Sequence, residues 1–171
     1  MAILCHFPMP DNIKYRSFTA IYDKPTSSLI APLNILPLLM ADKTSRNIQV
    51  KVNALWDTGA TATCIKPALF EHLDMRLFDS TNYTLLAGVG GTIAAKATLI
   101  SLFLTSAFEI AFCPVYVADF PGNADMLIGM DIINKGDFVV CNTDAKTSFS
   151  FVMPPFPDRI DFTKKAIILN K

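Results

Sequence analysis

Apolar and polar residues alternate with a period of two along several segments of this chain, which is typical of β-strands that bury one face. The alternation is clearest over 48–56, where Ile48, Val50, Val52 and Ala54 are separated by polar residues. Other short runs are rich in β-branched and aromatic residues, and turn-forming residues lie between these runs. The pattern therefore predicts a mostly β protein.

The remaining runs predict turns, hairpins and two short helices. Strands are expected over the ranges 16–22, 33–40, 81–86, 92–104, 109–117, 127–129, 138–140 and 148–152. Turns at 88–91 and 142–147 join two pairs of these strands into hairpins. Proline at a first helical position predicts a helix over 67–73, and a following glycine ends a second helix over 130–135.

Length and charge narrow the classes of protein that fit. The 171 residues are 51% hydrophobic and carry 15 basic against 15 acidic side chains, which indicates one globular domain and excludes intrinsic disorder. Zero net charge argues against non-specific binding to nucleic acid or an anionic membrane. The longest uncharged stretch, 25–41, contains three prolines and is shorter than the roughly 20 apolar residues of a spanning helix. Since the N-terminus lacks the features of a secretory signal, we expect a cytoplasmic protein without nucleic-acid or membrane partners.

The chain divides into a central domain and two extensions. We expect residues 1–30 to form an N-terminal extension with one possible strand, and residues 31–153 to form the domain. Residues 154–171 are expected to be a C-terminal tail, because prolines near its start interrupt regular structure.

The cysteines do not form a metal-binding pattern. Cys5, Cys64, Cys113 and Cys141 include no pair closer than 28 residues, and there is no Cys-x-x-Cys or Cys/His cluster. We therefore expect no metal and no cofactor. Because Cys64, Cys113 and Cys141 each lie beside β-type apolar residues, we expect them to be buried free thiols.

One short motif suggests chemistry. The tetrapeptide Asp57-Thr58-Gly59-Ala60 directly follows a predicted strand. A strand end holds a carboxylate rigidly, glycine lets another backbone approach closely, and the threonine hydroxyl can bond to neighbouring backbone. These features suit a carboxylate in a substrate groove. On its own, the tetrapeptide fits an Asx turn at the end of a strand equally well.

Two further features follow the tetrapeptide in the chain. Gly88, Gly90 and Gly91 lie at the tip of a predicted hairpin, and Leu127-Ile128-Gly129 leads from a strand into a short helix. In this order, the three features resemble those of the retroviral-type (retropepsin-like) aspartic peptidases, and the resemblance covers residues 33–152. It implies an all-β, closed-barrel-like fold with one or two short helices.

The resemblance also implies roles for individual residues. Asp57 would be the catalytic aspartate, and Thr58, Gly59 and Ala60 would support it within the same loop. The other implied positions are the flap residues Gly88, Val89, Gly90 and Gly91, and the residues behind the catalytic loop, Leu127, Ile128 and Gly129. Such a flap would close over an extended peptide, although an ordinary surface hairpin fits the same glycines.

Three positions depart from the family pattern. Trp56 replaces the usual medium-sized aliphatic residue before the aspartate. Thr61 and Met130 stand where retroviral members often have an acidic residue and an arginine, so both ends of that ion pair are missing. We therefore expect a different local packing at these positions.

The single Asp-Thr-Gly sequence predicts a dimer. Aspartic-peptidase chemistry uses two carboxylates that share a proton, and a two-fold symmetric homodimer would supply the second one. Asp131 is instead expected to be a structural carboxylate in the first turn of a helix. The segment 138–152 is expected to form part of the dimer contact, because Phe149 and Phe151 share one face of a strand.

These features predict a homodimeric aspartic endopeptidase that uses water to hydrolyse a peptide or protein substrate. A non-catalytic peptide-binding or scaffolding module with the same fold is the alternative. The pattern Asp-x-Gly-x-Thr at 57–61 also occurs in actin-like and sugar-kinase ATPases, but this chain lacks the length and the helices of their two lobes. The intact carboxylate favours the enzyme, because a pair of facing carboxylates is costly to keep without use.

Overall fold

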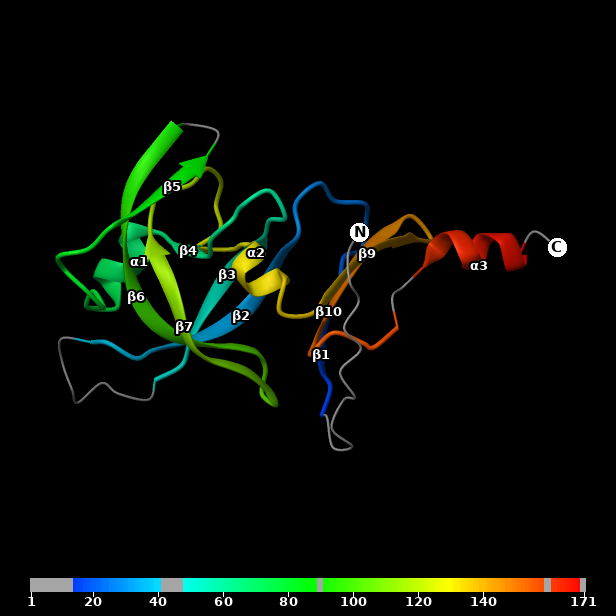
Figure 1. Cartoon of the computed structure of the whole chain (residues 1–171), viewed down its shortest axis with the longest axis horizontal. Coiled ribbons are helices and arrows are strands. Elements are labelled where there is room, and N and C mark those ends of the chain that lie inside the picture. Colours follow the sequence, from blue (N-terminus) through cyan, green and yellow to red (C-terminus); the bar gives the residue numbers. More distant parts are fainter. Residues whose placement is uncertain (1–13, 41–47, 89–90, 159–160, 170–171) are drawn as a thin grey trace, which may run out of the picture.

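The computed structural model of this chain describes residues 14–40, 48–88, 91–158 and 161–169, which form a β-barrel, a small second sheet and a projecting helix (Figure 1). The barrel and its extra strand are built from β2 (Ile30–Pro37), β3 (Val50–Trp56), β4 (Cys64–Ile65), β5 (Thr84–Gly88), β6 (Gly91–Thr105), β7 (Phe108–Val117) and β8 (Met126–Ile128). The second sheet, called the terminal sheet below, consists of β1 (Arg16–Ile21), β9 (Asp137–Thr143) and β10 (Lys146–Met153). The helices are α1 (Pro67–His72), α2 (Met130–Ile133) and α3 (Phe162–Leu169).

Six strands close the barrel in the order β2-β3-β8-β4-β7-β6, and β6 pairs again with β2. The pairs β3–β8 and β4–β7 are parallel, and the other neighbours are antiparallel. Because β3 and β8 run in the same direction and pair through Trp56 and Ile128, the loops that follow them leave the barrel at the same place. The closed, all-β barrel that the sequence predicts is confirmed.

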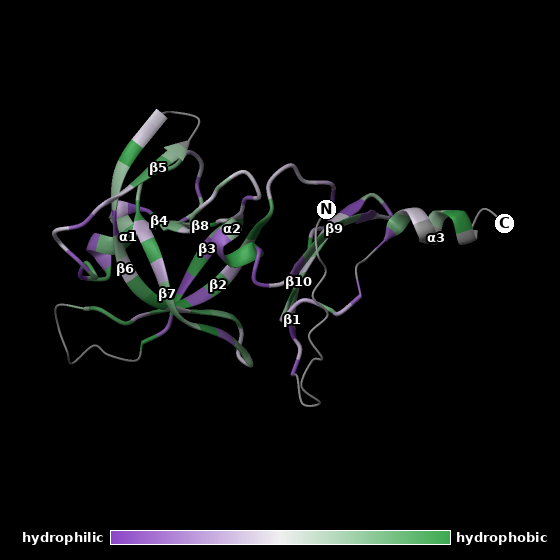
Figure 2. Ribbon diagram, viewed as in Figure 1, coloured by the Kyte–Doolittle hydropathy of each residue, from purple (hydrophilic) through white to green (hydrophobic). Residues whose placement is uncertain are grey.

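Alternate residues of the strands fill the barrel. In β3, Val52, Ala54 and Trp56 are buried, whereas Lys51 and Asn53 are exposed. Figure 2 shows this mixture of hydrophobic and hydrophilic positions along the barrel strands. Burial of one large aliphatic side chain contributes about 2 kcal/mol. The largest fully buried side chains of the barrel strands are Ile35, Val52, Ile65, Ile100, Leu102, Phe108, Val115, Met126 and Ile128.

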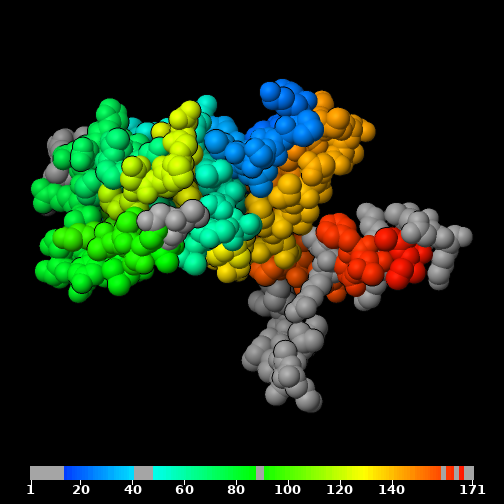
Figure 3. Space-filling view, turned by 90° about the horizontal axis from the view of Figure 1, so that it is seen from above, coloured from blue at the N-terminus to red at the C-terminus, as the bar shows by residue number. Residues whose placement is uncertain are grey.

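The terminal sheet packs beside the barrel through aromatic residues. Its strand order is β1-β10-β9, and Figure 3 shows the N-terminal strand and the C-terminal hairpin side by side, next to the barrel. Phe149 and Phe151 of β10 are 1% and 0% exposed within the single chain. Both rings are therefore buried within one chain, and the expectation that these two side chains contribute to a dimer contact is wrong. The expected part of the segment 138–152 in a dimer stays a prediction.

The hairpin between β9 and β10 has the turn that its sequence predicts. Thr143 pairs with Lys146, and the two residues between them, Asp144 and Ala145, have φ angles of 53° and 57°. Two consecutive residues with positive φ define the two-residue hairpin turn whose twist matches that of the strands.

Three elements differ from the sequence-based expectation. The strand expected over 33–40 is β2, which begins three residues earlier because Ile30 pairs with Leu55 of β3. The two-residue strand β4 was not expected, since it is too short to show a period. Neither was α3, which lies in the expected tail and begins after its prolines.

The cysteines follow the expectation in two of the three described cases. Cys64 and Cys113 are 8% and 4% exposed, and burial raises the pKa of each thiol to about 11. Cys141 is exposed, so the expectation of burial is wrong there. It pairs with Ser148, and this pair lies on the outer face of the terminal sheet, opposite the face that carries Phe149. Cys5 lies outside the described residues.

The described ranges lack two features that would indicate a membrane or a metal. Over these ranges, no helix has the length and apolarity needed to span a membrane. Within the same ranges, no group of three or more His, Cys, Asp or Glu side chains could hold a metal ion.

Candidate active site

Asp57 is held at the end of β3 by backbone hydrogen bonds. Its N–H donates to the carbonyl oxygen of Ile128 over 3.0 Å, and the N–H of Ala60 donates to the Asp57 carbonyl oxygen over 3.2 Å. The half-buried carboxylate accepts a hydrogen bond through Oδ1 from the N–H of Gly59 at 2.8 Å. A Cβ at Gly59 would lie 3.1 Å from that same oxygen. The loop therefore fixes the carboxylate and leaves little space beside it.

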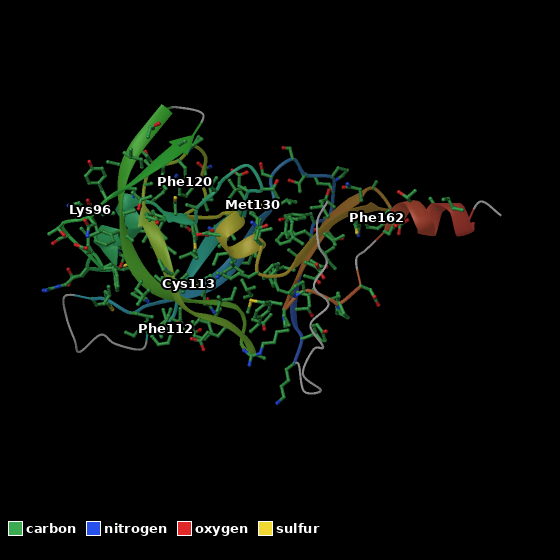
Figure 4. All side chains as sticks on the ribbon, in the orientation of Figure 1. Lys96, Phe112, Cys113, Phe120, Met130 and Phe162 are labelled. Atoms are coloured by element: carbon green, nitrogen blue, oxygen red, sulfur yellow. The ribbon has the colours of Figure 1, made fainter. Side chains whose placement is uncertain are left out.

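The Asp57 loop and the chain after β8 are joined directly through their backbones. The N–H of Met130 donates to the carbonyl oxygen of Ala60 at 2.8 Å, and the N–H of Asp131 donates to that of Thr61 at 3.3 Å. Figure 4 labels Met130 at the start of α2. Thr61 and Met130 are the two positions that lack the family's ion pair, and here their backbones take part in the connection. Whether this packing differs from that of the family stays a prediction.

A buried threonine reinforces the same junction. Thr63 is 0% exposed; its Oγ1 accepts a hydrogen bond from the N–H of Gly129 at 3.1 Å and donates to Asp131 Oδ1 at 2.7 Å. The N–H of Thr63 donates to Asp131 Oδ2 at 3.0 Å, and Asp131 Oδ1 also accepts from the N–H of Ile132. The carboxylate of Asp131 is thus engaged in holding the two loops together. The sequence analysis missed Thr63, since one threonine among three in 58–63 has no distinguishing signal.

Gly129 allows the two loops to come this close. A Cβ at this position would lie 2.6 to 2.8 Å from backbone atoms of Ala62, a separation at which something must shift. Ile128 is 0% exposed within the barrel core, whereas Leu127 faces the groove described next. The three residues of this segment therefore have different surroundings, although they are adjacent.

A groove of about 530 Å³ opens beside Asp57. Its apolar walls come from the β5–β6 hairpin, the end of β8 and the segment after β7, which carries Phe120 (Figure 4). The residues that line it are Asp57, Gly59, Ala60, Thr61, Ala62, Cys64, Leu86, Ala87, Gly91, Ile93, Ala118, Asp119, Phe120, Pro121 and Leu127. Thr58 is exposed. The site thus combines a fixed carboxylate with an apolar groove of a size that accommodates side chains of a peptide.

The hairpin over the groove contains the glycines that the sequence singles out. Gly88 at the end of β5 pairs with Gly91 at the start of β6, so the expected hairpin is present. Gly91 has a φ of 112°, a conformation that L residues with side chains rarely adopt. Val89 and Gly90 lie outside the described residues. The role of this hairpin as a flap stays a prediction.

Comparisons with known proteins find similar sequences and structures. The family model described as gag-polyprotein putative aspartyl protease matches residues 45–135. A retropepsin-like aspartic protease from Rickettsia conorii is 14% identical and aligns with 82% of this chain and 96% of its own, with a TM-score of 0.49. The EIAV protease in complex with the inhibitor HBY-793 is 23% identical, with 63% and 86% of the two chains aligned and a TM-score of 0.45. The Simian Foamy Virus (mac) protease is 18% identical, with 61% and 92% aligned and a TM-score of 0.34. No curated protein matches the sequence.

Proposed function

Because this chain belongs to the gag-polyprotein aspartyl protease family, we propose that it is an aspartic endopeptidase with Asp57 as its catalytic carboxylate. One observation carries the proposal: a carboxylate fixed at a strand end by the Gly59 N–H faces an apolar groove of about 530 Å³. In the proposed site, Gly59 and Ala60 shape the loop, and Gly129 lets the supporting segment pack behind it. No other described part of the chain combines an Asp-Thr-Gly loop with a groove.

The proposed enzyme works as a homodimer, because each chain supplies one such carboxylate. Two Asp57 side chains that face each other across a two-fold axis cannot both ionise easily, so they hold one proton between them. Thr58, which is exposed in the single chain, would then contact its symmetry mate beneath the pair.

The reaction follows from this shared proton. The ionised carboxylate removes a proton from water while the water oxygen attacks the carbonyl carbon of the scissile peptide bond. The protonated carboxylate gives its proton to the carbonyl oxygen, which yields a tetrahedral diol. As the diol collapses, the carboxylate that took a proton from water gives it to the leaving nitrogen, and the C–N bond breaks. The other carboxylate takes the proton of a diol hydroxyl, so the pair holds one proton again. No metal or cofactor takes part in these reaction steps.

The groove favours an extended peptide with apolar side chains. Leu86, Ile93, Phe120 and Leu127 offer apolar surface, and the edge of the β5–β6 hairpin offers backbone groups to a substrate strand. Closure of a flap formed by residues 88–91 would exclude water from the bound peptide.

A cleavage assay on wild type and Asp57→Asn tests the proposal. The change is nearly isosteric, so the variant should keep its melting temperature, its dimer and its affinity for peptides while cleavage of a denatured protein is lost. The matched control is Asp144→Asn, which changes an exposed carboxylate in the β9–β10 turn at a positive φ that asparagine tolerates. It should cleave like wild type.

The same assay separates the proposal from the alternative module. Cleavage by Asp57→Asn at the wild-type rate would refute the role of Asp57. A wild-type protein that binds peptides in the groove but cleaves none over the acid to neutral range would identify a non-catalytic binding module. Light scattering that finds only monomers in an active sample would refute the shared pair.

A further inference from the structure

Trp56, the residue before Asp57, connects the barrel to the terminal sheet. Its ring is 3% exposed and stacks on Phe138 of β9 with a centroid distance of 5.4 Å and an interplanar angle of 2°. The ring also stacks on Phe18 of β1, with a centroid distance of 6.2 Å and an interplanar angle of 15°. Its centroid lies 5.3 and 5.2 Å from those of Phe149 and Phe151 of β10. All three strands of the terminal sheet therefore contact one indole ring.

The backbone of Trp56 is equally constrained. Its N–H donates to the carbonyl oxygen of Leu29 at 2.9 Å, and it pairs with Ile128 across β3 and β8. The next N–H along the chain, that of Asp57, donates to Ile128. The peptide unit between Trp56 and Asp57 is rigid, so a shift of the Trp56 backbone that accompanies a displaced ring is passed on to the Cα of Asp57. The position of the ring thus influences the position of the carboxylate.

The indole also carries a polar group that the packing does not use. Nε1 of Trp56 is buried, and no hydrogen-bond partner for it exists in the described part of the chain. An unpartnered buried N–H lowers stability, so a leucine or phenylalanine would fill a simple core position without this cost. What the indole adds is a large flat surface that reaches rings on several strands at once.

We propose that Trp56 is a positioning residue, and that its stacking on Phe138 and Phe18 fixes the position of the Asp57 carboxylate. The proposal rests on the function proposed above, because it concerns the geometry of the same carboxylate. The competing explanation is that the rings are ordinary core, in which case their loss lowers stability and nothing else.

Phe108 provides a matched control for this distinction. It is 1% exposed and stacks on Phe151 at 6.0 Å and 6°, so it belongs to the same aromatic region. No ring contact between Phe108 and Trp56 is present. Phe138, by contrast, is half-buried and contacts Trp56 directly. Truncation to leucine should therefore lower stability more at Phe108, whereas it should disturb Trp56 more at Phe138.

Steady-state kinetics of Phe138→Leu and Phe108→Leu test the proposal. Both are measured at protein concentrations where further addition no longer raises the specific activity, so that dissociation does not contribute. Phe138→Leu should lower kcat about tenfold and keep KM within about twofold of wild type. Phe108→Leu should melt at a lower temperature than Phe138→Leu but keep kcat within about twofold of wild type. Phe138→Tyr keeps the stacked ring and should restore kcat.

Amide hydrogen exchange provides a readout that does not depend on turnover. The N–H groups of Asp57 and Gly59, which bond to Ile128 and to the Asp57 carboxylate, should exchange several-fold faster in Phe138→Leu than in Phe108→Leu. Equal exchange in the two variants, or a loss of kcat that simply follows melting temperature, would overturn the proposal. If wild type cleaves no peptide, the proposed function fails, and the exchange rates still decide whether Trp56 positions Asp57.

Discussion

The Asp57 loop and the terminal sheet are joined to the barrel by different kinds of interaction. The loop is held by directional hydrogen bonds, among them those from Met130 to Ala60 and from Gly129 to Thr63. The terminal sheet is held mainly by rings, with centroids 5.2 to 6.2 Å apart around Trp56. Hydrogen bonds require particular atoms at particular places, whereas ring packing requires apolar area and tolerates exchange among large side chains. The two regions should therefore respond differently to substitution.

The largest effect is expected from Gly129→Ala, which breaks the loop junction. The new Cβ would lie within 2.6 to 2.8 Å of the Ala62 backbone, so the two loops must separate, at a cost of about 3 kcal/mol in unfolding free energy. The variant should cleave no substrate, and its melting midpoint should lie below that of wild type. Gly122→Ala is the control, since Gly122 has a φ of 92° with nothing within 4 Å of an added Cβ. Its backbone strain alone should cost about 1 kcal/mol. Similar denaturation midpoints for the two variants would contradict the close approach.

A smaller effect is expected from Thr63→Val, which keeps the shape of the junction and removes its hydroxyl. Asp131 Oδ1 and the Gly129 N–H each lose a buried partner, so we expect a loss of about 2 kcal/mol in urea denaturation. The same change in the terminal sheet, Thr19→Val, removes an exposed hydrogen bond of 2.9 Å to Ser150. It should change stability by less than about 0.5 kcal/mol. If Thr63→Val proves as mild as Thr19→Val, hydrogen bonding does not distinguish the regions.

In the terminal sheet, one substitution should stabilise the protein. Ala145 has a φ of 57° in the β9–β10 turn, where glycine has no Cβ penalty. Ala145→Gly should therefore raise the unfolding free energy by up to about 1 kcal/mol. Ala20→Gly in β1, where the backbone is an ordinary strand, should lower it by a similar amount. Thermal melts of both variants check the opposite signs, and a loss in both would mean that the turn does not strain Ala145.

The smallest effect is expected in the loop before β5, which belongs to neither region and provides a baseline. Hydrogen bonds from Thr81 and Asn82 lower the pKa of Asp79 to about 2. Because the pKa of Asp79 is lower in the folded state, its carboxylate stabilises the fold at pH values above the unfolded-state pKa, near 4. This contribution is lost as the pH falls through the folded-state pKa of about 2. Asp79→Asn should thus melt slightly below wild type at pH 6, and this difference should shrink as the pH falls to 2. A difference in melting temperature that is as large at pH 2 as at pH 6 would exclude the carboxylate as its cause.

The two regions also differ in how far the sequence alone predicts them. The Asp57 loop could be recognised because the Asp57-Thr58-Gly59-Ala60 tetrapeptide, the glycines at 88–91 and the segment 127–129 follow one another in an order that resembles a known family. Thr63 could not be recognised, because its partner Asp131 lies 68 residues away and the pairing of β8 with β3 and β4 brings the two together. Local patterns do not reveal such long-range contacts.

In the terminal sheet, the pattern predicted the strands but not what they cover. The alternation in β10 correctly places Phe149 and Phe151 on one face, yet the same alternation fits a face turned toward another subunit. Burial of both rings within one chain depends on Trp56, which is distant in sequence. Cys141 was misplaced for a related reason, since the direction of a side chain on an edge strand is set by its pairing with Ser148.

The chain contains a single tryptophan, and the structure places it in the ring cluster beside Asp57. Its fluorescence therefore comes from one known location, with no second indole to mix into the signal. A shift in emission wavelength would report a change in water access at the joint between the barrel and the terminal sheet. The protein thus carries a built-in optical reporter that needs no attached dye.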